Sequence, residues 1–152
     1  MEKNEALLSY NPPVSEVMSR NVIFVQETDA IPSTIQMFES KRISAAPVKN
    51  AEGKCVGIVT KSDLSKLDVM IQLIQLEARQ MEASLFVKNV MNPTELRTLS
   101  VNASLKEASQ MMVAHRIHHV FISDDAGNVV GVTSTFDIAK AYANLPACQP
   151  TQ

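Results

Sequence analysis

The chain has 152 residues, a net charge of −2 at pH 7 and no block of Lys or Arg, which argues against nucleic-acid binding. It contains no run of about 18 apolar residues and no signal-peptide pattern at its N-terminus, so we expect no membrane span and no secretion. Its two cysteines, Cys55 and Cys148, match no disulfide or metal spacing, which favours a reduced, cytoplasmic protein.

The first half of the chain predicts a strand, a helix and a hairpin in that order. Residues 22–25 form a short apolar run typical of a strand, and a turn and a helix follow it. Two more apolar runs, residues 45–48 and 55–59, are joined by a polar turn that ends in Gly53, which predicts a β-hairpin. The second run then continues into another helix, so the order is β-α-β-β-α.

The middle of the chain, residues 65–86, predicts a connecting helix with at most one interruption. This segment has apolar residues at helical spacing and contains neither Gly nor Pro. Val69, Leu73 and Leu76 widen the apolar stripe beyond what one core contact needs. Two interpretations stay open: a surface for a partner, or a helix buried by its own domain.

The second half predicts the same elements again. Residues 97–101 are expected to form a strand, and the helix after it begins with a capping box made by Ser104 and Glu107. A second hairpin is expected from residues 120–123 and 129–133.

The two halves are copies of one unit. VGIVTKSDL begins at Val56, and its near twin VGVTSTFDI begins 74 positions later. One unit has a sheet too small to be stable alone, whereas two copies bury each other's apolar faces. The expected organisation is an N-terminal extension (1–13), repeat 1 (14–65), a connecting helix (66–86), repeat 2 (87–140) and a C-terminal tail (141–152).

The motif Thr60-x-x-Asp63 and its twin Ser134-x-x-Asp137 have two possible roles. As a capping box, the hydroxyl and the carboxylate satisfy free backbone amides in the first turn of a helix. As a ligand site, a helix N-terminus attracts a phosphate, the hydroxyl donates to it, and the carboxylate accepts from the two hydroxyls of a ribose. Local pattern alone favours the cap, and the duplication favours a site.

Each copy has the same series of features: a Val-Met pair, a strand, a helix, Arg-Ile-x-x-x-Pro-Val, a glycine turn and Val-Gly-Ile-Val-Thr-x-x-Asp-Leu. Over residues 14–140, this doubled pattern resembles the cystathionine-β-synthase (CBS) domain pair, or Bateman module. The resemblance implies an α+β fold with two β-α-β-β-α repeats packed sheet to sheet in pseudo-twofold symmetry. It also implies clefts for adenosyl ligands (AMP, ADP, ATP or S-adenosylmethionine) and assembly into a homodimer.

The same resemblance assigns site residues. Asp63 and Asp137 are expected to bind ribose, and Thr60 and Ser134 to face phosphate. The remaining pocket residues implied by the resemblance are Ser44, Ala45, Ala46, His118, His119, Val120, Val22 and Ile23, with backbone at 93–96 closing the base side.

The second copy departs from the family pattern in three places. Phe121 replaces the usual proline, which Pro47 supplies in the first copy. His119 stands where an arginine often contacts phosphate and Ala45 offers no charge there, so both argue against a polyphosphate. Thr133 precedes Ser134, which leaves open which hydroxyl faces the ligand.

Other chemistries have little support in the sequence. His115 and His119 would need one continuous helix to share a metal ion, but a strand is expected to begin near His119, so we expect no metal site. His118 and His119 could make stability or ligand affinity depend on pH near 6.5. No catalytic triad, paired carboxylates or Gly-rich phosphate loop is present, so we expect no enzyme.

The sequence therefore predicts a cytoplasmic regulatory module for energy sensing. It is expected to bind an adenosyl ligand and to signal through a protein partner or its own assembly, without an attached effector domain, a membrane or a nucleic acid. The alternative is a CBS scaffold that acts only in protein association.

Overall fold

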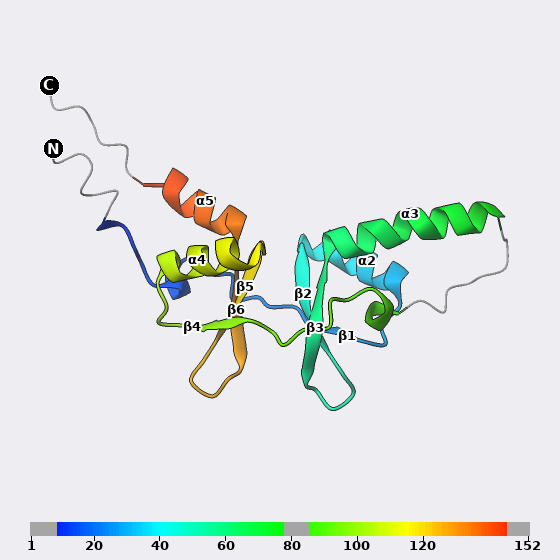
Figure 1. The fold of residues 1–152 in the computed structure, drawn as a ribbon, viewed down its shortest axis with the longest axis horizontal. Helices are drawn as coiled ribbons and strands as arrows, with labels where there is room; N and C mark the ends of the chain where they lie inside the picture. The colour runs from blue at the N-terminus through cyan, green and yellow to red at the C-terminus, as the bar shows by residue number, and fades with distance from the viewer. Residues whose placement is uncertain (1–8, 78–85, 146–152) are drawn as a thin grey trace, which may run out of the picture. The chain divides into compact units, whose positions relative to one another are not determined.

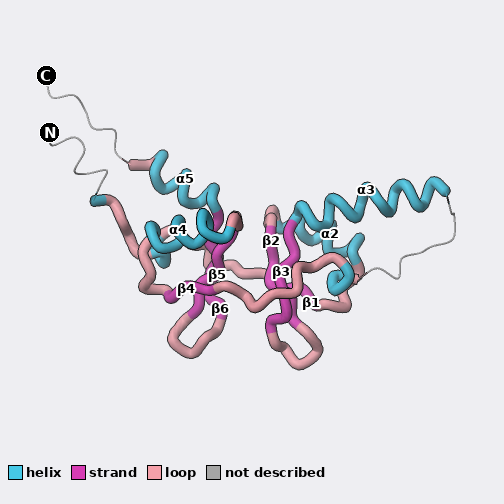
Figure 2. Tube along the Cα trace, viewed as in Figure 1, coloured by secondary structure: helices cyan, strands magenta, loops and turns pink. Residues whose placement is uncertain are grey.

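The computed structural model describes residues 9–77 and 86–145, apart from the side chains of 67–69, 72, 73, 76 and 77. The described residues divide into two compact units, each with one three-stranded sheet and two α-helices. We name them by their strands: the β1–β3 unit (residues 23–77 and 86–96) and the β4–β6 unit (residues 9–22 and 97–145). Figure 2 shows the strands and helices of each.

The β1–β3 unit has its strands in the order β1-β2-β3. β1 pairs with β2 in parallel, and β2 pairs with β3 in an antiparallel hairpin whose turn points away from both helices (Figure 1). Its elements are β1 (Val25–Gln26), α2 (Ile31–Lys41), β2 (Ala45–Lys49), β3 (Cys55–Thr60), α3 (Lys61–Glu77) and the 3-10 helix η2 (Val87–Asn89).

The β4–β6 unit repeats this arrangement, with the order β4-β5-β6, a parallel first pair and an antiparallel second pair. Its elements are the 3-10 helix η1 (Val14–Glu16), β4 (Thr98–Ser100), α4 (Leu105–His115), β5 (His119–Ser123), β6 (Val129–Ser134) and α5 (Thr135–Ala143). The predicted α+β class and the doubled β-α-β-β-α order are confirmed.

The two copies match in backbone detail as well as in order. α2 and α4 both end on an arginine in the left-handed region, Arg42 and Arg116, each with φ 53° and ψ 43°. The hairpin turns contain Gly53 and Gly127 at φ 78° and 83°, values that glycine adopts without steric cost. The same local sequence therefore imposes the same helix stop and the same turn twice.

The leading segments of the two sequence repeats are exchanged between the compact units. In the β4–β6 unit, Ser19 forms an antiparallel bridge with Val132 of β6. In the β1–β3 unit, Asn92 forms the corresponding bridge with Ile58 of β3. Each compact unit thus combines the leading segment of one sequence repeat with the strands and helices of the other.

This exchange explains the glycine in each copy of the duplicated motif. A Cβ atom on Gly57 would lie 2.5 Å from the carbonyl oxygen of Asn92, because the leading segment passes directly over β3. A Cβ atom on Gly131 would instead meet the flexible side chain of Met18. The first contact is with backbone and cannot relax easily, whereas the second is with the end of a side chain.

Each unit has its own hydrophobic core. In the β1–β3 unit, the fully buried side chains include those of Ile31, Val48 and Val87. In the β4–β6 unit, they include those of Val14 and Ile122. Val14 and Val87 are the residues that anchor the exchanged leading segments, so the exchange is part of core formation.

The predicted connecting helix is continuous with the last helix of the first repeat. α3 runs from Lys61 to Glu77 without a break, and the rest of the prediction up to residue 85 lies outside the described residues. Phe86 was expected to be helical but forms a β-bridge with Ala30. No described helix has the length and apolar character needed to cross a membrane.

Part of the predicted N-terminal extension is built into the β4–β6 unit. The side-chain oxygen of Asn11 accepts a hydrogen bond of 2.9 Å from the backbone N–H of Lys106, and the carbonyl of Pro12 accepts one of 2.9 Å from Leu105. Tyr10 stacks edge to face on Tyr142, with 5.7 Å between ring centroids. The segment therefore caps α4 and contacts α5.

Replacing Thr133 by Val should stabilise the protein. The Thr133 side chain is fully buried and its hydroxyl has no hydrogen-bond partner within the described part of the chain, whereas Val59 stands at the same place in the first copy. Removing such a group is expected to raise the free energy of unfolding by about 1 kcal/mol. Thermal or urea unfolding measures this.

Thr34→Val is the matched control. Thr34 is buried too, but its hydroxyl donates a 2.9 Å hydrogen bond to the carbonyl of Ala30. This variant should be destabilised by about 0.5–1.5 kcal/mol. Equal destabilisation of both variants would contradict the assignment of an unpartnered hydroxyl at Thr133.

Candidate functional site

The junction between β3 and α3 is held by hydrogen bonds between Thr60 and Asp63. The backbone N–H and the hydroxyl of Thr60 both donate to Oδ2 of Asp63, at 2.9 Å and 2.7 Å. In return, the backbone N–H of Asp63 donates to the Thr60 hydroxyl oxygen at 3.3 Å. Within the described part of the chain, this capping box leaves Oδ1 of the half-buried Asp63 without a hydrogen bond.

The junction between β6 and α5 has the same geometry. The backbone N–H and the hydroxyl of Ser134 donate to Oδ2 of Asp137, both at 2.8 Å, and the Asp137 N–H donates to the Ser134 hydroxyl at 3.2 Å. Ser134 forms this cap, whereas Thr133, the other hydroxyl residue at this point of the chain, is buried in the core.

Strand pairing brings other predicted site residues next to each cap. Ala45 lies opposite Thr60 in the β2–β3 hairpin, and the carbonyl of Ser44 accepts a 2.8 Å hydrogen bond from the N–H of Lys61. Ser44, Ala45, Thr60 and Asp63 therefore gather at one end of the β1–β3 sheet.

The equivalent residues gather in the β4–β6 unit. His119 lies opposite Ser134, and the carbonyl of His118 accepts a 3.0 Å hydrogen bond from the N–H of Thr135. The hairpin therefore places two imidazole-bearing residues beside the second cap, where the first has Ser44 and Ala45.

Four residues of the predicted ligand site differ from the others, either in their burial or in the compact unit to which they belong. Ala46 and Val120 have no exposed surface and pack in the two cores, so neither residue is open to a ligand in this structure. Val22 and Ile23 are adjacent in sequence but belong to different compact units.

The two junctions differ electrostatically at His119. Burial lowers the pKa of His119 below its usual 6.5, the neighbouring His118 lowers it further, and the carboxylate of Asp137 partly opposes this. Desolvation is the largest of these effects, so the imidazole is neutral at pH 7. Ala45 at the matching position of the first junction has no titratable group.

A third capping box shows what the motif does without these neighbours. Oε2 of Glu107 accepts from the backbone N–H and the hydroxyl of Ser104 at 2.7 Å and 2.9 Å, and the Glu107 N–H donates back. These hydrogen bonds lower the pKa of Glu107. This box begins α4 at a loop, away from a hairpin end, and provides an internal reference for capping alone.

Sequence reasoning missed a small pocket in the β1–β3 unit. It lies between α2 and α3 and has a volume of about 90 Å³, well below the range of roughly 300–1,000 Å³ typical of small-molecule sites. Its signal in the sequence is weak because the two helices are far apart in the chain. The lining residues are Ile35, Phe38, Glu39, Lys61, Leu64 and Ser65.

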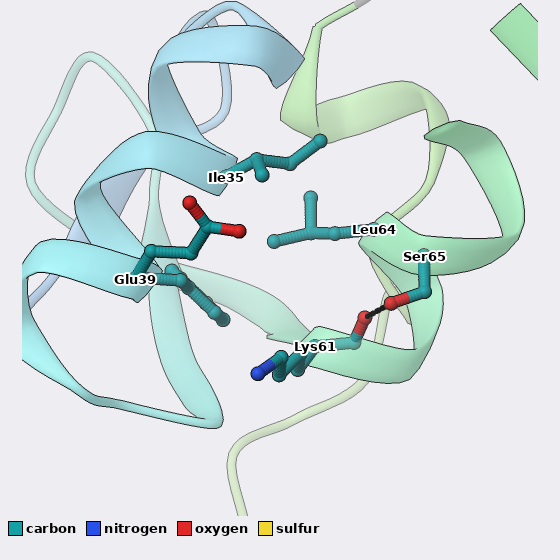
Figure 3. Close-up of a pocket in the computed structure, with 6 residues that line it drawn as sticks. Ile35, Glu39, Lys61, Leu64 and Ser65 are labelled. Atoms are coloured by element: carbon teal, nitrogen blue, oxygen red, sulfur yellow. Dashed lines mark hydrogen bonds between the residues drawn. The ribbon is translucent and has the colours of Figure 1, made fainter. Parts of the chain in front are cut away.

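The pocket has an apolar floor and a charged edge. Figure 3 shows Ile35 and Leu64 inside it, with Glu39 from α2 and Lys61 from α3 at its rim. None of the lining residues belongs to the predicted ligand site. The described residues also contain no cluster of three or more potential metal ligands.

Solved structures with the same fold include CBS domain pairs that hold adenosyl compounds. The CBS pair of protein MJ0100, solved with 5′-methylthioadenosine and S-adenosyl-L-methionine, superposes with a TM-score of 0.70 at 20% identity and covers 86% of this chain and 99% of that one. CBSX2 in complex with AMP superposes with a TM-score of 0.66 at 19% identity, covering 86% and 96%.

Curated relatives include short and long proteins. An uncharacterized protein of Methanocaldococcus jannaschii is 24% identical, and the match covers 84% of this chain and 89% of that protein. The gamma-3 subunit of 5′-AMP-activated protein kinase from Sus scrofa is 29% identical, and the match covers 84% of this chain but 24% of the subunit. Inosine-5′-monophosphate dehydrogenase of M. jannaschii is 28% identical, and the match spans 22% of that enzyme.

The family assignment rests on a match to nearly all of the duplicated region. The CBS domain model matches residues 14–69 and 87–144, and these two ranges include the copies predicted at 14–65 and 87–140 from the repeat of 74 positions. The chain belongs to the CBS domain family and carries two CBS domains in tandem.

Proposed function

We propose that this CBS pair is a regulatory module that binds an adenosyl ligand, AMP, ADP, ATP or S-adenosylmethionine, at its two strand-to-helix junctions. The observation that carries the proposal is that Oδ1 of each capping aspartate, Asp63 and Asp137, has no hydrogen bond from any residue that the structure describes. That atom accepts a hydrogen bond from a ribose hydroxyl while Oδ2 continues to hold the cap.

The hydroxyl of each cap has a second role in this proposal. In the structure, the hydroxyls of Thr60 and Ser134 donate to Asp63 and Asp137. A phosphate at the helix N-terminus offers a competing acceptor, and the hydroxyl turns to it at the cost of one hydrogen bond within the cap. Ribose recognition leaves the cap intact, whereas phosphate recognition alters it.

A bound ligand produces a signal by restraining the helix that begins at its junction. Each junction fixes the direction in which α3 or α5 leaves its sheet, so a ligand held at the junction stabilises one orientation of that helix. Signalling then passes to a protein partner or to a second copy through the helices. A pure scaffold is the competing function, favoured by the exposed apolar side chains of Met70, Phe136 and Tyr142.

Asp63→Asn and Asp137→Asn should each weaken ligand binding at their own junction. Loss of a charge-assisted hydrogen bond costs about 1.5–3 kcal/mol, roughly a ten-fold to hundred-fold increase in Kd. Isothermal titration with a panel of AMP, ADP, ATP and S-adenosylmethionine measures the effect, and the double variant should lose measurable binding.

Glu107→Gln is the matched control for this experiment. It weakens a capping box of the same geometry that lies at the start of α4. We expect a small loss of stability and an unchanged Kd. Full binding by the double aspartate variant would refute the ribose assignment, and a wild-type protein that binds no adenosyl compound would favour the scaffold.

His119→Gln should remove a pH-dependent loss of stability. Because the folded pKa of His119 lies below 6.5, the unfolded state binds more protons between the two values. The wild-type free energy of unfolding therefore falls as pH drops from 6.5 through the folded pKa, and is fully retained above 6.5. Urea unfolding at several pH values between 5 and 8 tests this.

The difference between wild type and variant is the quantity to follow, because other groups titrate in both. His118→Gln should reduce this pH dependence without removing it, since His118 lowers the pKa of His119 less than burial does. A parallel pH dependence in wild type and His119→Gln would show that His119 is not the group responsible.

A further inference from the structure

The last helices of the two compact units are held to their sheets to different degrees. In the first turn of α3, the side chain of Leu64 is 2% exposed and belongs to the core of the β1–β3 unit. The residue 74 positions later, Ile138 of α5, is only partly buried, and α5 has no buried residue. α5 has 9 residues, and a helix of this length is not stable without tertiary contacts. Its position therefore depends on contacts beyond its own sheet.

The N-terminal segment supplies such a contact at the far end of α5. The ring of Tyr10 packs edge to face on the ring of Tyr142, with 5.7 Å between the centroids and 75° between the planes. This is a preferred geometry for a pair of aromatic rings. Tyr142 lies in the last turn of α5, whereas the cap formed by Ser134 and Asp137 holds the first turn. Two separate attachments thus fix the direction of one short helix.

Tyr10 is itself held on a firm base. The side chain of Asn11 and the carbonyl of Pro12 accept hydrogen bonds from the first turn of α4, both at 2.9 Å. Val14 is fully buried and anchors the segment in the core of the β4–β6 unit. The two prolines just before it have a fixed φ and leave the backbone little freedom. We call residues 10–14 the strap, because they tie α5 to α4.

The first copy of the sequence offers no equivalent pair of rings. The Val-Met pairs of the two leading segments end at residues 18 and 91, an offset of 73 positions. At this offset, Ala83 takes the place of Tyr10 in the sequence. Asp68 stands 74 positions before Tyr142. The sequence therefore provides the ring pair only for the helix of the second junction.

We propose that Tyr10 is a positioning residue for the second ligand junction. By holding the far end of α5, its ring fixes the direction of the helix and with it the position of Oδ1 of Asp137 in the first turn. Without the ring, α5 samples several directions, and the apparent affinity for a ligand falls by the fraction that has Asp137 in place. The first junction has no such dependence. This inference rests on the proposed binding of adenosyl ligands at the two junctions.

The coupling is reciprocal, so a ligand at the second junction should also restrict the ring pair. The chain contains 2 tyrosines, and both belong to this contact. After incorporation of fluorotyrosine, fluorine NMR therefore gives one resonance for each ring of the pair. AMP should shift these resonances in Asp63→Asn, which keeps the second junction, and leave them unshifted in Asp137→Asn. Equal shifts in the two variants would contradict the coupling.

Tyr10→Ala and Tyr10→Phe test the effect on affinity, each in an Asp63→Asn and in an Asp137→Asn background. Where the second junction remains, Tyr10→Ala should raise the Kd for AMP roughly threefold to tenfold, as expected for the loss of one aromatic pair. Tyr10→Phe keeps the ring and should retain the Kd. Where the first junction remains, neither change should alter the Kd. An unchanged Kd in Tyr10→Ala, or the same loss at both junctions, overturns the proposal.

Hydrogen exchange in the ligand-free protein separates failure of this proposal from failure of the proposed function. Tyr10→Ala should speed exchange of the α5 amides by at least about threefold and leave the α3 amides unchanged. Tyr142 is 44% exposed, so Tyr142→Ala should keep the fold and give the same pattern. Circular dichroism verifies that both variants are folded.

Unchanged exchange in α5 overturns the proposal even where AMP binds. Faster exchange in α5 of a protein that binds neither AMP, ADP, ATP nor S-adenosylmethionine contradicts the proposed function and supports the hold of Tyr10 on α5.

Discussion

The hydrogen bonds from a strand-ending hydroxyl residue to one oxygen of an aspartate determine how each unit is built. Thr60 with Asp63 and Ser134 with Asp137 fix where an outer strand ends and a helix begins. The cap occupies one carboxylate oxygen and leaves the other free. The proposed binding role is therefore compatible with the structural one, because a carboxylate has two acceptor atoms and the cap needs one.

The second constraint is the exchange of leading segments. Residues 13–19 complete the unit that contains β6, and residues 86–92 complete the unit that contains β3. Gly57 is required where backbone crosses backbone, and Val14 and Val87 bring the leading segments into the cores. Neither sequence repeat contains all the residues of its own compact unit, which accounts for two copies within one chain.

Much of the fold was predictable because the repeat shows the same pattern twice. The hairpins, the helix positions and the Ser104–Glu107 box depend on neighbouring residues, and local sequence encodes them. The exchange of segments was not predictable, because both copies carry the same pattern and either pairing satisfies it. β1 proved shorter than expected and begins at Val25, since it pairs only with the last residues of β2.

The predicted site residues fall into three groups for physical reasons. Local capping determines the positions of Thr60, Asp63, Ser134 and Asp137. The register of the hairpins determines the positions of Ala45 and His119. A sequence pattern encodes both the capping and the register. Ala46 and Val120 are buried because β2 and β5 are the central strands of their sheets, and each has three consecutive buried residues. The α2–α3 pocket depends on how two distant helices pack, and sequence spacing carries no information on that.

The central proposal is that Oδ1 of Asp63 and Oδ1 of Asp137 each accept a hydrogen bond from a hydroxyl of a ribose held at their own junction. Titration calorimetry with AMP and with its 2′,3′-dideoxy analogue tests this most directly, because the two ligands share base and phosphate. The account predicts that the dideoxy compound binds at least about tenfold more weakly, as expected for a lost charge-assisted hydrogen bond. Equal affinities for the two compounds would contradict it.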